Sequence, residues 1–282
     1  MLRSSNPVLS RKDAFTPGAP ERQAYNGPQN QSYQSYDYGQ TAAYGEAVPG
    51  ATVDQQPGPG RMTLDDVITK TAVLIGVVVL SAALAWFLVP DALTYPVLIA
   101  AALGGVVISF VVALRRKMNP ALVGVYAVVE GVFVGLLSSV FESFYPGLVV
   151  SAVFASMIAF AVTLAAYKFV GVRIRGLVAK VTVVATIAFA IAMLANFGLS
   201  FLGINLGLRA GITGPVGLLP ILVSGIAVVL CVLNLFLDFQ YIDDGIRMGA
   251  PAKESWRAAF GLMVTLVWMY VELLRILSYF RR

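Results

Sequence analysis

The stretch VITKTAVLIGVVVLSAALAWFLV, residues 67–89, decides the class of fold because it is an almost unbroken apolar run. At about 1.5 Å per residue, a helix of roughly 20 residues crosses a hydrocarbon core of about 30 Å. Helices in soluble cores are shorter and keep a polar stripe. The bilayer offers no partner for free backbone groups, so a spanning segment of this kind must be helical.

Similar runs, each bounded by charges, glycine or proline, fill the rest of the chain. With the first, they lie at approximately 67–89, 94–114, 120–141, 147–167, 178–200, 216–242 and 255–280. The sequence therefore predicts an all-α integral membrane protein, with a seven-helix transmembrane bundle over residues 63–282. Six spans with one re-entrant segment remain the alternative, because an odd number places Arg281 and Arg282 opposite the other basic residues.

The composition excludes many function classes. Of the 282 residues, 58% are hydrophobic and 12% charged, whereas a soluble domain has about 25% charged residues. The chain has no histidine and one cysteine, which excludes a Ser-His-Asp triad, a histidine-ligated metal and an internal disulfide. We expect no enzyme activity, no cofactor and no metal site of the usual kinds.

Residues 1–62 differ from the rest because they are rich in Gly, Pro, Gln, Ser and Tyr, as in QNQSYQSYDY (29–38). Such a segment has too few apolar side chains to offset its ordering entropy, so we expect a disordered tail. Docking of protein partners through its tyrosines is the alternative function for this segment.

The net charge of +5 is a topology signal, because the basic residues gather in alternate loops. Arg209 stands by itself in the opposite loops, and the ten others are Arg115, Arg116, Lys117, Lys168, Arg173, Arg175, Lys180, Arg247, Lys253 and Arg257. The loops rich in Lys and Arg face the cytoplasm in membrane proteins. We expect a plasma-membrane protein with a cytoplasmic tail and no nucleic-acid partner.

Three carboxylates lie inside predicted spans: Glu130, Asp238 and Glu272. Each costs roughly 2.5–3.5 kcal/mol to insert at mid-membrane, so each needs a reason. If all three face the bundle interior, they form a ladder along which a cation or proton can pass.

Structural roles for these carboxylates remain open. Glu272 and Arg275 are three residues apart and can neutralise each other, and Glu130 can hydrogen-bond across helices. Asp238 has no base three or four residues away, and Arg115 lies at a compatible depth. A buried Asp–Arg pair of this kind is expected to act as a pH latch without histidine. In the third span, Gly131 and Gly135 have the GxxxG spacing of close helix packing.

Three blocks carry a family resemblance: ALRRKMNPALVGVYAVVEGVFVGLLSS (113–139), LNLFLDFQYIDDG (233–245) and AFGLMVTLVWMYVELLRIL (259–277). They resemble the Bax inhibitor-1 (YccA-like, transmembrane BAX inhibitor motif) family. With NPVLSR at 6–11, the chain looks like its actinobacterial branch. The resemblance implies seven helices with the last at the centre, and a pH-sensitive calcium leak.

The resemblance also assigns roles to single residues. It implies that Asp238 is the first aspartate of a paired-aspartate pH sensor and that Arg115 is the arginine that interacts with it. The second aspartate falls on Thr265, so the paired pattern is broken here. Glu272 lies two turns later on a similar face, about 10 Å further along.

Two functions follow from these observations. The first is a cation leak for Ca²⁺ or protons, with Asp238 and Arg115 as its gate and Glu130 and Glu272 along its path. The second is a membrane scaffold or stress-response modulator that transports nothing and acts through protein partners of the tail.

Overall fold

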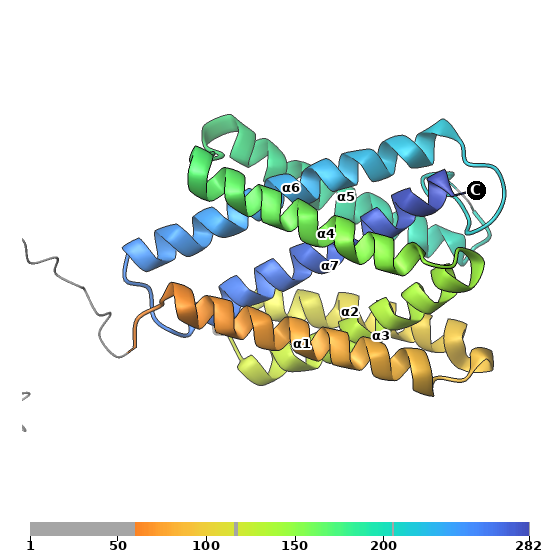
Figure 1. Ribbon diagram of the computed structural model, residues 1–282, viewed down its shortest axis with the longest axis horizontal. Coiled ribbons are helices and arrows are strands. Elements are labelled where there is room, and N and C mark those ends of the chain that lie inside the picture. Colours follow the sequence, from red (N-terminus) through yellow and green to blue (C-terminus); the bar gives the residue numbers. More distant parts are fainter. Residues whose placement is uncertain (1–59, 116–117, 205, 282) are drawn as a thin grey trace, which may run out of the picture. The chain divides into compact units, whose positions relative to one another are not determined.

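The computed structural model describes residues 60–115, 118–204 and 206–281, and its helices follow the predicted runs closely (Figure 1). They are α1 Leu64–Leu88, α2 Asp91–Leu114, α3 Pro120–Phe144, α4 Leu148–Ala165 with a π-helical extension η1 Ala166–Val170, α5 Gly176–Ser200, α6 Leu218–Arg247 and α7 Glu254–Phe280. Within the described residues, seven segments are long and apolar enough to cross a membrane. The predicted seven-helix fold is confirmed.

Local capping explains where several helices begin. The Thr63 hydroxyl accepts the Asp66 N–H at 3.1 Å before α1, and the Asn119 side chain accepts the Ala121 N–H at 3.0 Å before α3. These bonds satisfy amide groups that have no partner within the first turn. Glu142 does the same for α4, because its carboxylate accepts the Val149 N–H at 2.9 Å.

The helices run alternately between two ends of the bundle. The Gly60 end holds the start of α1, the end of α2, the start of α3 and the loops around 171–175 and 248–253. The Arg281 end holds the α1–α2, α3–α4 and α5–α6 connections and the end of α7 (Figure 1). Residue 281 therefore lies opposite residue 60, as seven spans require.

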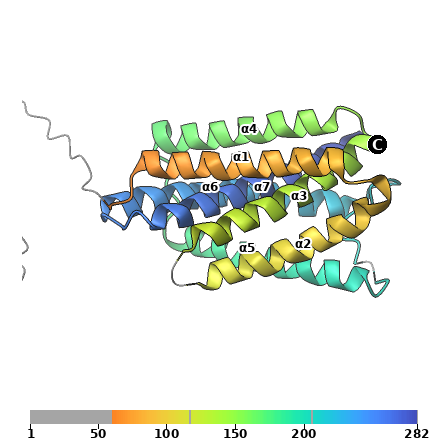
Figure 2. The same ribbon diagram turned by 90° about the horizontal axis from the view of Figure 1, so that it is seen from below.

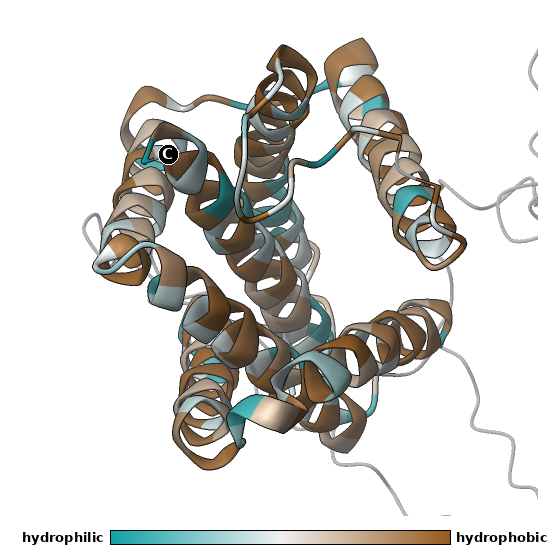
Figure 3. Cartoon of the chain, turned by 90° about the vertical axis from the view of Figure 1, so that its right-hand side faces the viewer, coloured by the Kyte–Doolittle hydropathy of each residue, from teal (hydrophilic) through white to brown (hydrophobic). Residues whose placement is uncertain are grey.

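Helix α7 is the centre of the bundle, as the family resemblance implied. It packs against α1, α3, α4 and α6, whereas α2 packs mainly on α3, and α5 mainly on α6 (Figure 2). Viewed from the Arg281 end, most residues of the helices are hydrophobic (Figure 3). Many outward side chains are large and exposed, such as Phe87, Leu114 and Phe169, which is the surface that a bilayer would cover.

The closest helix pair is α1 with α3, at the two glycines of the predicted GxxxG pattern. A Cβ atom added to Gly131 would overlap the Ser81 side chain and the Val78 carbonyl, and one added to Gly135 would overlap the Ala82 backbone. The absence of side chains at these positions lets the two backbones touch.

The segment before α1 is fixed to the α6–α7 loop. The Met62 N–H donates to the Ala250 carbonyl at 2.7 Å, and the Ala252 N–H donates to the Gly60 carbonyl at 2.8 Å. Met62 is only 2% exposed. Residues 60–62, which the sequence assigned to the tail, are thus part of the bundle. The rest of the predicted tail, 1–59, lies outside the described residues.

Candidate functional site

Asp238, on α6, faces α7 and has a hydroxyl group as its partner. The Thr265 Oγ1 lies 2.7 Å from Asp238 Oδ2 and 3.0 Å from the Gly261 carbonyl, one turn earlier on α7. A hydroxyl has a single proton to donate, so it can serve one of these acceptors at a time. Thr265, which occupies the position of the second aspartate of the family's pair, is therefore the residue that binds Asp238.

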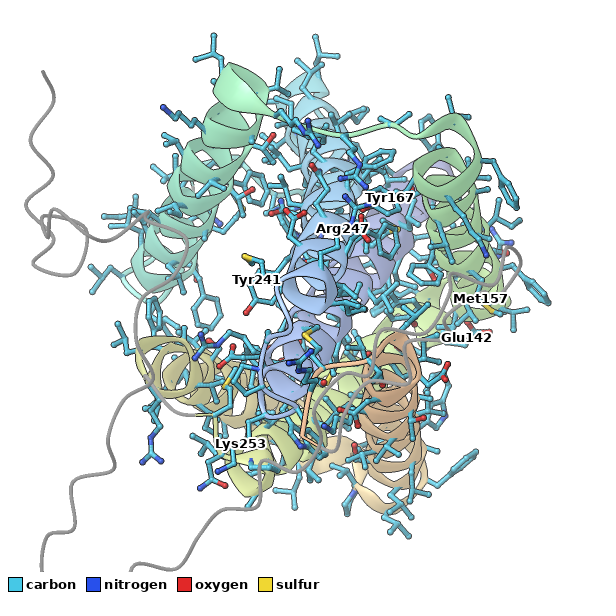
Figure 4. All side chains as sticks on the ribbon, turned by 90° about the vertical axis from the view of Figure 1, so that its left-hand side faces the viewer. Glu142, Met157, Tyr167, Tyr241, Arg247 and Lys253 are labelled. Atoms are coloured by element: carbon cyan, nitrogen blue, oxygen red, sulfur yellow. The ribbon has the colours of Figure 1, made fainter. Side chains whose placement is uncertain are left out.

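A cavity of about 300 Å³ adjoins the Asp238 carboxylate. Gly261 makes room for the Asp238 carboxylate, since a Cβ atom on Gly261 would lie 3.3 Å from Asp238 Oδ1. The cavity lies toward the Gly60 end and is lined by Val112, Ala113, Met118, Asp238, Tyr241, Arg257, Ala258, Phe260 and Gly261. Tyr241 and Lys253 mark this end of the bundle in Figure 4. Asp238 is thus placed beside a space whose lining residues lie toward the Gly60 end of the bundle.

Arg115 lies at the end of α2, just beyond the cavity wall formed by Val112 and Ala113. It is exposed, and the ion pairs of the described residues do not join it to Asp238. Arg257, which also lines the cavity, pairs with Glu254 at 3.3 Å. Among the described side chains, the Asp238 carboxylate is therefore held by the Thr265 hydroxyl and by no basic group.

Glu272 is the most enclosed carboxylate of the described chain, at 1% exposure. Its two oxygens accept two hydrogen bonds of 2.6 Å from the guanidinium of Arg209, and the Trp268 indole approaches Oε1 at 3.4 Å. This fork geometry is the strongest form of a charged pair. Glu272 is therefore neutralised by Arg209, whereas the sequence offered Arg275 as its counter-charge.

Arg209 comes from the long α5–α6 connection and joins three helices. Besides Glu272 on α7, it donates to Ser224 Oγ on α6 at 3.1 Å. On α5 it lies 3.2 Å from the Met193 sulfur and 5.6 Å from the centre of the Phe189 ring. The arginine thus holds α5 against the α6–α7 pair at the Arg281 end.

Glu130 lies in a different seam from the other two carboxylates. A Cβ atom on Gly105 of α2 would come 3.2 Å from Glu130 Oε2, so this carboxylate sits between α2 and α3. Asp238 and Glu272 both lie along the α6–α7 contact. The described residues contain no group of three acidic or cysteine side chains that could hold a metal ion. Two of the three carboxylates thus lie in the interface between α6 and α7, and the third lies in the interface between α2 and α3.

A second charged cluster lies at the Gly60 end, around Asp243. Its carboxylate accepts hydrogen bonds from Arg173 at 2.5 Å and Tyr167 at 3.2 Å, and lies 3.2 Å from Arg247. Tyr167 and Arg247 are close together in Figure 4. These contacts tie the α4–α5 connection to α6, so Asp243 has a structural role.

Sequence reasoning missed Arg209 as a site residue. The signal was present, because Arg209 is the single base among the loops of its side, while Glu272 needed a partner. Sequence distance gave no means to connect them, since 63 residues separate the two and the arginine belongs to an irregular segment.

The comparison with protein families agrees with this architecture. The family model described as Bax inhibitor 1 like matches residues 6–282, nearly the whole chain. No curated protein matches the sequence closely enough to count as a relative. From the seven spans, the central last helix and this match, we conclude that the chain belongs to the Bax inhibitor-1-like family and is a multi-pass integral membrane protein.

Proposed function

We propose that the protein is a cation leak of the cell membrane that passes Ca²⁺, catalyses no reaction, and responds to pH through Asp238. The observation that carries the proposal is the Asp238 carboxylate, which lies inside a membrane-spanning helix pair, beside a cavity, with a hydroxyl as partner. A charge held in this way is expensive in a membrane and is typical of ion pathways. The basic loops support an orientation with the Gly60 end in the cytoplasm.

The arrangement favours passage over tight binding. Ca²⁺ takes six to eight oxygen ligands, and the described residues offer no such cluster. A single carboxylate with a hydroxyl attracts a cation and lets it leave, which conduction requires. Glu272 is already neutralised by Arg209, so we assign this conformation to a closed state. Arg115 would reach Asp238 only if the end of α2 moved across the cavity, and we propose that movement as part of gating.

Thr265 gives the sensor two hydrogen-bond states. When Asp238 is ionised, the Thr265 hydroxyl donates to it. When Asp238 is protonated, its own O–H donates to Thr265 Oγ1, and the threonine proton turns to the Gly261 carbonyl 3.0 Å away. Thr265 therefore accommodates one proton at the site without a second carboxylate.

We expect Asp238→Asn to abolish the pH dependence of Ca²⁺ flux, because an amide does not titrate in this range. The measurement is dye-reported Ca²⁺ entry into liposomes that contain the full chain, at a series of pH values. Asp244→Asn is the matched control, since Asp244 is an exposed aspartate on the same helix. Deletion of residues 1–59 should also leave flux intact. A wild-type pH profile in Asp238→Asn would overturn the proposal.

We expect the wild-type pH profile to follow the binding of one proton, with a Hill coefficient near one. Thr265→Asp places a second carboxylate beside Asp238, and like charges this close separate their protonation into two steps. The same flux assay should then show two transitions, or one shifted by more than about one pH unit. Thr265→Ser keeps the hydroxyl and should keep the single transition. Two transitions in the wild type would contradict the one-proton site.

A further inference from the structure

A second cavity, of about 580 Å³, lies between α2 and α5 and reaches α3 and α7. Along α2 its lining runs from Leu98 to Phe110, about 18 Å of helix. Ile99, Phe110 and Leu194 are exposed, so the cavity is a groove on the lipid-facing side of the bundle. Because α2 packs mainly on α3 and α5 mainly on α6, neither helix closes this groove.

Arg275 is the one charged residue among the described lining residues of the groove. Within the described chain, its guanidinium takes part in no ion pair and donates no hydrogen bond. Its expected neighbour, Glu272, is taken by both arms of Arg209. Arg209 and Arg275 thus carry two positive charges, and Glu272 neutralises the one on Arg209. The positive charge of Arg275 is left over at this end of the bundle.

The depth of Arg275 corresponds to the edge of the hydrocarbon layer. It lies five residues before the end of α7 at Phe280, or about 7 Å from that helix end. The 27 residues of α7 extend over about 40 Å and a hydrocarbon core over about 30 Å, so roughly 5 Å of helix projects at each end. Arg275 therefore lies about 2–3 Å inside the edge of the hydrocarbon core at the Arg281 end. A lipid phosphate of that leaflet is within reach of a long arginine side chain at this depth, and the groove extends from Arg275 toward mid-membrane.

We infer that this groove binds an anionic phospholipid, with its phosphate on Arg275 and an acyl chain along α2. An arginine fork matches phosphate geometry in two hydrogen bonds. The apolar residues that line the groove make dispersion contacts with the acyl chain of the lipid, and these contacts are lost when the groove is unfilled. The inference is independent of ion transport, since it rests on the unpaired charge and on the shape of the groove.

The test is binding of phosphatidylglycerol and phosphatidylcholine with identical chains to the full-length protein in neutral detergent, counted by native mass spectrometry. We expect a preference for phosphatidylglycerol that falls at least about fivefold in Arg275→Gln. Arg281→Gln, which removes an exposed arginine at the same end, should keep the preference. Ala190→Phe should weaken binding by filling the groove while leaving the charge.

Each contrary result has a definite meaning. An unchanged preference in Arg275→Gln, or unchanged binding in Ala190→Phe, overturns the site. Binding of oleate without binding of phosphatidylglycerol overturns the assignment to a phospholipid and indicates a fatty-acid carboxylate. Since Arg275→Gln breaks no described ion pair, its thermal unfolding in phosphatidylcholine should match the wild type, which separates lost binding from lost folding.

Discussion

Glu272→Leu is expected to destabilise the folded bundle by about 3–5 kcal/mol, the range for removal of one partner of a buried ion pair. The substitution leaves Arg209 inside the bundle beside Arg275 with no carboxylate between them. The free energy of unfolding in mixed micelles, measured by titration with a denaturing detergent, gives the loss directly.

The same experiment with both partners replaced identifies the cause. Arg209→Met combined with Glu272→Leu removes both charges. The double variant should therefore lose far less free energy of unfolding than the sum of the losses in the two single variants. Asp66→Asn is the control, because the Asp66–Lys70 pair has the same 2.6 Å distance as the Arg209–Glu272 pair. The side chain of Asp66 is 33% exposed, however, against 2% for the side chain of Glu272. Asp66→Asn should cost less than about 1 kcal/mol. Additive losses would show that the two residues act separately.

The helices could be predicted from the sequence because spanning a bilayer imposes a local pattern, and each apolar run contains that pattern by itself. The end of α6 shows the limit of this reasoning. The apolar run ends near residue 242, yet the helix continues to Arg247, because helical hydrogen bonding extends into water where hydropathy gives no signal. Asp238 was predicted in the same way, as a charge at an expensive depth.

The partners in the site could not be predicted, because they depend on tertiary packing. Arg209 follows a run of residues without helical or strand periodicity, and its route back to α7 is a property of the folded loop. The contact of Thr265 with Asp238 depends on how α6 and α7 are rotated about their axes relative to each other. The sequence of neither helix gives that rotation. Arg115 was predicted as the partner of Asp238 from its depth and from the family resemblance, and neither shows which contacts the end of α2 makes in one particular conformation.

Gly135→Ala is expected to destabilise the protein by about 1–3 kcal/mol or more, because the added methyl group has no space. Its Cβ atom would overlap the Ala82 carbonyl and Cα, which are backbone atoms that cannot rotate away, so α1 and α3 must separate. Overpacked cores typically lose this much. The loss outweighs the roughly 0.5–1 kcal/mol by which alanine favours a helix over glycine.

Gly124→Ala, on the same helix, is the matched control and should change stability in the opposite direction. No heavy atom lies within 4 Å of a Cβ atom at this position, so only the gain in helix propensity remains. Unfolding of the two variants by detergent titration under identical conditions compares the same chemical change at a crowded and at an open site. If both variants had equal stability, the close approach of α1 and α3 at Gly135 would be contradicted. Opposite signs, in contrast, would show that contact between the two backbones, and not glycine itself, holds this pair of helices together.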